Sequence, residues 1–198
     1  MPDETAVTSQ NRFSHLRYTI KRPFWSFFGR KYYVHAPDGS VVMFLKHPLM
    51  KLRQEFTIYT DDTETVPLLT IKARNVIAMN MAHDVFDTAN GEKTGSIRSR
   101  GMKSIVRDTW DILDAEDHVV GLMEEEGAAM LRRFLKFLPG RHKIELGGQR
   151  FASLRQPFRF FVKELALDLS PGDGKLDARF SVGCALLALM KETAREAS

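Results

Sequence analysis

The sequence has little cysteine and no export signal. Its 198 residues contain one cysteine, Cys184, which cannot form a disulfide within the chain. Chains without disulfides are typical of reducing compartments. The first ten residues are polar and acidic, whereas a secretory signal begins with basic residues followed by an apolar stretch. We therefore expect a cytoplasmic protein, with peripheral attachment to a membrane as a further expectation.

No apolar run in the sequence is long enough to cross a membrane as a helix. The most apolar run, 180–190, is flanked by Arg179 and Lys191. As a helix it would be under about 20 Å long at a rise of roughly 1.5 Å per residue, whereas a bilayer core is about 30 Å thick. Because the run is apolar on every side, it must be buried within the protein. We therefore expect a central buried helix that includes Phe180, Val182, Cys184, Leu186, Leu187, Leu189 and Met190.

The sequence also lacks the residue patterns of catalytic and metal sites. The six histidines are dispersed, and none is spaced from another histidine or from the cysteine as metal ligands are. There is no Gly-x-Ser-x-Gly elbow, and the phosphate-loop letters within 91–96 stand in the wrong order. Asp168, Asp173 and Asp177 lie close together in sequence but do not match a calcium loop. We predict a non-enzymatic protein with no catalytic residues, no cofactor and no metal site.

The sequence does contain a series of short strands joined by tight turns. The dipeptides Asp38-Gly39, Asn90-Gly91 and Gly147-Gly148 separate runs in which apolar and polar residues alternate. Such dipeptides suit hairpin turns because they tolerate a positive φ. Similar units recur at intervals of about 25 residues, within the range of internal repeats. The pattern predicts an antiparallel meander of hairpins.

One segment between the strands has helical periodicity. Glu124, Glu125 and Glu126 precede an apolar stripe, and Pro139-Gly140 follows it. Acidic residues favour the start of a helix, and Pro-Gly favours its end. We predict a peripheral amphipathic helix over 124–138 that packs on the sheet, with a helix on a membrane surface as the alternative.

No linker divides the chain. Residues 1–12 are expected to form a flexible tail, and 13–198 to form a single domain. The strands before the terminal helix indicate a mainly β fold in which a sheet wraps around that helix.

The charge pattern suggests an anionic partner. The net charge is +4 and the pI is about 9.2, which favours partners such as phospholipid headgroups. In alternating strands, Lys72 shares a polar face with Arg74, and Arg98 shares one with Arg100. Phosphates favour the forked guanidinium of Arg and the point charge of Lys. We therefore expect these four residues to bind anionic lipid.

Two aromatic and basic stretches allow other interpretations. Within 17–33, the side chains of Phe24, Trp25, Phe27 and Phe28 suit either an interfacial anchor or the packed core. The basic and aromatic letters of 150–161 suit stacking on nucleic acid. Ordinary alternating strands give the same letters, so nucleic acid is not favoured as a partner.

The order of these motifs resembles the tubby-like superfamily, in particular its LURP-one-related and phospholipid scramblase-like branches. The likeness is carried by the hairpin 85–97, the segment 110–115 and, most specifically, the ending 176–190. It extends over roughly 16–193 of the chain. The resemblance implies a closed antiparallel β-barrel, tubby-like, around a central C-terminal hydrophobic helix.

The resemblance also sets expectations for function. Tubby domains bind phosphoinositide headgroups through clustered Lys and Arg, and scramblases are associated with phospholipid movement, calcium and a membrane anchor. This chain lacks the Pro-rich N-terminal region and the cysteine cluster of animal scramblases. We therefore expect an anionic phospholipid-binding domain at a membrane surface. The alternatives are a protein-interaction or structural module with a protein partner, scramblase-like lipid handling, and a barrel with a deep ligand pocket.

Overall fold

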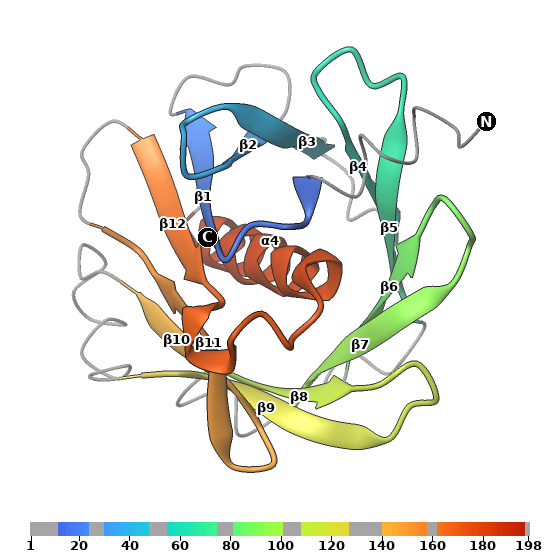
Figure 1. Ribbon diagram of the computed structural model, residues 1–198, viewed down its shortest axis with the longest axis vertical. Coiled ribbons are helices and arrows are strands. Elements are labelled where there is room, and N and C mark those ends of the chain that lie inside the picture. The colour runs from blue at the N-terminus through green and yellow to red at the C-terminus, as the bar shows by residue number, and fades with distance from the viewer. Residues whose placement is uncertain are drawn as a thin grey trace.

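The structure is a computed structural model that describes residues 12–23, 30–47, 55–74, 81–100, 108–126, 140–157 and 162–196. These residues form twelve strands, a short 3-10 helix and a long C-terminal helix (Figure 1). The strands are β1 (Arg17–Pro23), β2 (Arg30–His35), β3 (Val41–His47), β4 (Glu55–Tyr59), β5 (Pro67–Ala73), β6 (Ala82–Asp87), β7 (Lys93–Ser99), β8 (Thr109–Leu113), β9 (Val119–Glu125), β10 (Arg141–Leu146), β11 (Gln149–Arg155) and β12 (Val162–Asp168). The helices are η1 (Ser170–Gly172) and α4 (Ala178–Glu196).

The strands form one closed barrel in which each strand pairs with its neighbours in sequence. β1 and β12 close the barrel through an antiparallel register that runs from Arg17 opposite Asp168 to Pro23 opposite Val162. Each of the twelve described strands is therefore paired on both sides, so none of them forms an open edge of the sheet. This arrangement confirms the predicted antiparallel meander and the closed barrel.

The turns that join the described hairpins have the backbone geometry that their sequences predict. Gly39, Gly91, Gly147 and Gly148 all have positive φ angles. These hairpins lie at one end of the barrel, which we call the hairpin end.

Helix α4 lies in the middle of the barrel, as expected from the apolar run (Figure 1). Its apolar residues are packed in the core: Phe180, Val182, Cys184, Leu186 and Leu189 are buried, and Leu187 and Met190 are partly buried. Burial raises the pKa of the Cys184 thiol. Among the described residues, no helix is both long and apolar enough to cross a bilayer.

Asp177 caps the start of α4. Its Oδ1 accepts hydrogen bonds from the backbone N–H groups of Arg179 at 2.7 Å and Phe180 at 3.4 Å. These are two of the donors that a helix N-terminus leaves without an intrahelical partner. The cap fixes the point at which the chain turns into the barrel.

The space between helix and sheet is filled by alternate residues of each strand. In β5, Leu69 and Ile71 are fully buried, whereas Thr70 and Lys72 lie on the outer face. Helix α4 approaches the inner face of β5 and β6 closely at Gly183, where a Cβ would lie 3.1 Å from Cγ2 of Val85. A larger residue at position 183 would have to displace these two strands.

The prediction of a helix that starts at Glu124 is wrong. Glu124 and Glu125 belong to strand β9, where Glu124 lies opposite Thr109 and Glu125 lies opposite His142. Glu125 is only 3% exposed, so it is not part of a solvated helix start. The acidic run is accommodated in a strand because the ladders to β8 and β10 satisfy its backbone.

Several other predictions fall partly or wholly outside the described residues. They concern the rest of the amphipathic helix, 127–138, and most of the N-terminal tail, 1–11. They also include the aromatic residues Phe24, Trp25, Phe27 and Phe28. Around those aromatics, the stretch 17–33 forms β1 and the start of β2.

Candidate functional site

The four basic residues singled out in the sequence lie on or directly beside strands β5 and β7, which flank β6. Lys72 of β5 is in register with Asp84 of β6, and Arg98 of β7 is in register with Asp111 of β8. Arg74 and Arg100 follow the ends of β5 and β7. The register therefore places a carboxylate opposite a basic residue in both strand pairs, β5–β6 and β7–β8. We call the outer face of strands β4 to β8 the wall.

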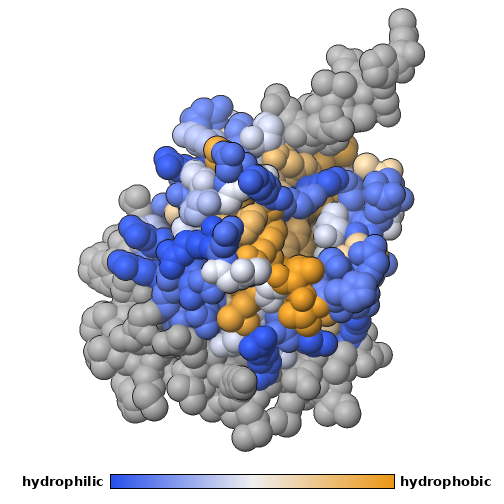
Figure 2. All heavy atoms as spheres, turned by 60° about the horizontal axis from the view of Figure 1, so that its bottom comes forward, coloured by the Kyte–Doolittle hydropathy of each residue, from blue (hydrophilic) through white to orange (hydrophobic). Residues whose placement is uncertain are grey.

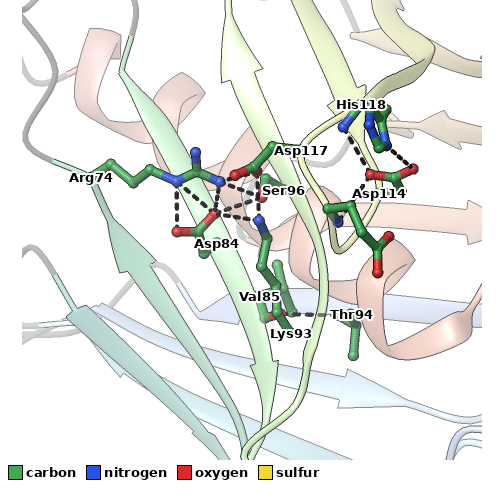
Figure 3. A network of polar contacts seen from close by, with 10 residues as sticks. Arg74, Asp84, Val85, Lys93, Thr94, Ser96, Asp114, Asp117 and His118 are labelled. Carbon is green, nitrogen blue, oxygen red and sulfur yellow. Dashed lines mark hydrogen bonds and ion pairs between the residues drawn. The ribbon is translucent and has the colours of Figure 1, made fainter.

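Arg74 is the centre of a network on this wall (Figure 3). Its Nε donates to both oxygens of Asp84, at 2.9 and 2.7 Å, and its Nη2 donates to Oγ of Ser96 at 3.0 Å. Nη2 also contacts Asp117, which reaches over from the β8–β9 hairpin. Lys93 Nζ lies 2.5 Å from Asp117 Oδ1 and 3.7 Å from Asp84 Oδ1. We call these five residues the Arg74 network.

The network keeps its carboxylates charged. Burial acts to raise the pKa of Asp84, but hydrogen bonds from Arg74 and Ser96 outweigh it, so this pKa lies below its ordinary value. Hydrogen bonds from Arg74 and Lys93 lower the pKa of Asp117 to about 2. Hydrogen bonds to Asp84 and Asp117 in turn raise the pKa of Arg74. These shifts move the pKa values of all three groups further from pH 7. General acid–base catalysis, by contrast, favours a pKa near the working pH.

Asp117 reaches the network because of its backbone conformation. Its φ angle is 73°, in the left-handed region. Asp and Asn enter this region more readily than most residues. The hairpin between β8 and β9 therefore contributes an ion-pair partner as well as a turn.

Arg98 and Arg100 share a single carboxylate. Arg98 Nη2 lies 3.0 Å from Oδ2 of Asp111, and Arg100 Nε lies 2.5 Å from Oδ1. The Asp111 side chain is only 10% exposed, whereas those of Arg98 and Arg100 are 40% and 36% exposed. We call these three residues the Asp111 triad. It carries two positive charges and one negative charge, with both guanidinium groups accessible to solvent.

Lys72 is the most exposed of the four basic residues. Its Nζ lies 3.7 Å from Oε2 of Glu55 on β4 and 5.8 Å from the ring centre of Phe86. More than half of each side chain of the Lys72–Glu55 pair is exposed, so the pair contributes little to stability. Taken together, five cations on this wall face four carboxylates, which leaves one net positive charge.

Four of the five cations of this wall were predicted from the sequence, whereas their partners were not. Asp84, Ser96, Asp111 and Asp117 were not singled out, and neither was Lys93. The detectable signal was alternation: Asp84 and Asp111 occupy outward positions on strands next to those of Lys72 and Arg98. It could be used only once the strand order and register were known.

A second polar group lies inside the barrel at the end opposite the hairpins. Glu125 and His142 are buried and in register, and the ring of His142 lies 5.6 Å from that of Trp110. Asp108 is also buried here, and its carbonyl oxygen accepts a hydrogen bond from the N–H of Glu125. On strand β6, burial lowers the pKa of another histidine, His83. This group was not predicted either.

The three aspartates weighed for calcium have separate structural roles. Asp168 accepts a hydrogen bond from the N–H of Ser170, Asp173 ends η1 with a φ angle of 52°, and Asp177 caps α4. Within the part of the chain that the structure describes, no three His, Cys, Asp or Glu side chains form a group that could hold a metal ion.

Comparison with known proteins supports the fold. The chain is similar to the X-ray structure of a protein from Arabidopsis thaliana, AT5G01750, with a TM-score of 0.50 and 10% sequence identity. The match covers 93% of this chain and 95% of that chain. At this identity the likeness shows the fold alone. No protein-family model and no curated protein matches the sequence.

Proposed function

We propose that the chain is a tubby-like barrel, related to the LURP-one-related and scramblase-like proteins, that binds anionic phospholipid headgroups without catalysing a reaction. The closed barrel around α4 supports the first part, because it is the architecture that the resemblance implies. A location in the cytoplasm, at the surface of a membrane, belongs to the same proposal.

The Asp111 triad is the observation that carries the lipid-binding part. Two accessible guanidinium groups on one carboxylate retain a positive charge, and guanidinium groups bind phosphate through forked hydrogen bonds. Arg74 is less suitable, because Asp84 and Asp117 already neutralise it together with Lys93. We therefore assign headgroup contact to Arg98 and Arg100, with Lys72 nearby, and a structural role to Arg74.

The test is flotation of the protein with phosphatidylcholine vesicles that contain phosphatidylserine or a phosphoinositide. The variant combines Arg98→Gln and Arg100→Gln with Asp111→Asn, so that no buried carboxylate is left without a partner. Its net charge falls by one. The matched control, Arg155→Gln, makes the same change of charge at an exposed residue on β11.

We expect the wild type and the control to float with anionic vesicles and the triple variant to remain unbound. Binding should weaken as salt is raised, because contacts between exposed charges are screened. Equal loss in variant and control would show that general charge, rather than the Asp111 triad, holds the lipid. Flotation that is indifferent to lipid charge and salt would refute the proposal.

A protein-interaction module is the second candidate, supported by apolar groups on the surface. Val119 and Val120, at the start of β9, are 52% and 40% exposed. Figure 2 shows hydrophobic side chains gathered on one face between hydrophilic ones. If the exposed surface at Val119 and Val120 is the functional one, Val119→Asp should abolish capture of a partner protein and leave vesicle binding unchanged.

A further inference from the structure

Two arginines extend the inner faces of β1 and β2 at the end of the barrel opposite the hairpins. In β1, Tyr18 and Ile20 are buried in the core, and Arg22 continues the same alternation. In β2, Arg30 precedes the buried Tyr32 in the same way. Both arginines lie beyond Lys21–Tyr33, the last register pair of the two strands, and therefore at the same end.

These arginines differ in their partners from four arginines elsewhere in the barrel. Arg74, Arg98, Arg100 and Arg179 each contact at least one carboxylate. Arg22 and Arg30 form no ion pair with any described residue. Their Nε atoms are buried without a hydrogen-bond partner. A buried N–H group without a hydrogen-bond partner is costly, so an anion from outside the chain that accepts hydrogen bonds from these Nε groups would be bound favourably here.

Two buried acidic residues at the same end, Glu125 and Asp108, belong to another part of the barrel. Glu125 lies on β9 and Asp108 precedes β8, whereas the neighbours of β1 in the barrel are β2 and β12. Both carboxylates have interaction partners of their own. On β12, the register partner of Arg22 is another basic residue, Lys163. In the ladder between β1 and β12, no acidic residue is therefore in register with Arg22.

We propose that Arg22 and Arg30 form an anion-binding site for a phosphomonoester. Two uncompensated guanidinium groups match the charge of a phosphomonoester, which approaches −2 at neutral pH. They also match its oxygen geometry, because each guanidinium can donate two parallel hydrogen bonds. The phosphomonoester can come from a soluble phosphate ester or from a lipid headgroup such as phosphatidic acid. This site goes beyond the function proposed above, because it lies inside the barrel rather than on the wall that carries the Asp111 triad.

The experiment measures binding of glycerol 3-phosphate by calorimetry, with acetate at equal ionic strength as the reference anion. A second arm uses phosphatidylcholine vesicles with and without phosphatidic acid. The variant is Arg22→Gln with Arg30→Gln. The matched control is Lys21→Gln with Lys31→Gln, which removes the same charge from the outer faces of the same two strands.

We expect glycerol 3-phosphate to bind the wild type and the control, and to bind the Arg22–Arg30 variant at least about tenfold more weakly. Binding of phosphatidic acid vesicles alone would assign the site to a lipid headgroup. The melting temperature without ligand should not fall in the variant, since the buried Nε groups that it removes have no hydrogen bond to lose. Absence of binding to both probes, or equal loss in variant and control, would overturn the proposal.

The outcome is separable from that of the lipid-binding proposal. A chain that binds glycerol 3-phosphate but does not float with phosphatidylserine or phosphoinositide vesicles supports the inner site and refutes the outer one. A chain in which only the Asp111 triad variant changes flotation supports the outer site and refutes the inner one if both phosphomonoester probes also fail.

Discussion

Replacing Asp84 with Asn tests whether the Arg74 network stabilises the barrel. Asp84 accepts hydrogen bonds from Arg74 and from Ser96, whose side chain is fully buried. The Asp84 side chain is only 13% exposed, so water does not easily replace these contacts. Asn retains the shape and one acceptor oxygen but removes the charge. The change therefore isolates the electrostatic contribution of the carboxylate.

The expected loss follows from the number of partners that remain. A hydrogen bond to a charged group contributes roughly 1.5–3 kcal/mol to stability. Asp117 still contacts Arg74 and Lys93 in the variant, so the loss should fall in the lower part of that range. We expect about 1.5–2 kcal/mol less free energy of unfolding. For a chain of this size, that corresponds to a fall in melting temperature of about 3–8 °C.

Urea denaturation at several pH values measures both the size and the origin of this effect. The pKa of Asp84 is lower in the folded protein than its ordinary value of 3.8. Its contribution is therefore fully present above pH 3.8 and is lost as the pH falls through the lower folded pKa. The difference between wild type and Asp84→Asn should be constant near neutrality and should shrink in acid.

Two results would refute this account. A loss below about 0.5 kcal/mol at neutral pH would place the network among surface ion pairs of little value. A loss that persists unchanged in acid would show that Asn disturbs packing rather than charge. The control, Glu55→Gln, removes a carboxylate from the exposed pair with Lys72 and should change the stability by less than about 0.5 kcal/mol.

Three further substitutions test the barrel and its helix. Leu186→Ala, in the fully buried part of α4, should lower the free energy of unfolding by about 3–5 kcal/mol, measured by urea denaturation. Gly121→Ala should cost at least about 1–3 kcal/mol by the same assay, because its Cβ would lie 2.2 Å from the carbonyl oxygen of Glu145; a smaller loss would show that β10 moves easily. Asp177→Ala should lower the melting temperature by an amount equivalent to about 1 kcal/mol, since it removes the cap of α4; an unchanged melting temperature would show that Arg179 and Ser181 hold the helix start without it.

The parts of the fold that depend on local chemistry were predictable from the sequence. The hairpins followed from dipeptides such as Asn90-Gly91, and the central helix followed from a run too short for a bilayer and too apolar for the surface. The segment at Glu124 was predicted wrongly because an acidic run before an apolar stripe also fits a helix start. Glu125 belongs to a strand because its backbone pairs with that of His142 on β10. The two residues are far apart in sequence, so the local pattern does not reveal this pairing.

The candidate site was predictable only in part for the same reason. Alternation identified Arg98 and Arg100 as neighbours on one face, and both contact Asp111. Asp111 itself lies on another strand, and Asp117 reaches its partners through a hairpin with a positive φ. Identifying these acids requires the register of the strands, which the spacing of apolar residues along one strand does not define.

The partners of each arginine imply an order in which an anion would bind. At Arg74 an incoming phosphate competes with Asp84 and Asp117, and it gains little because the network is already neutral. At Arg98 and Arg100 it competes with one carboxylate for two guanidinium groups. At Arg22 and Arg30 it competes with none of the described carboxylates and also provides partners for two buried Nε atoms. Affinity for a soluble phosphomonoester should therefore be highest at the inner pair.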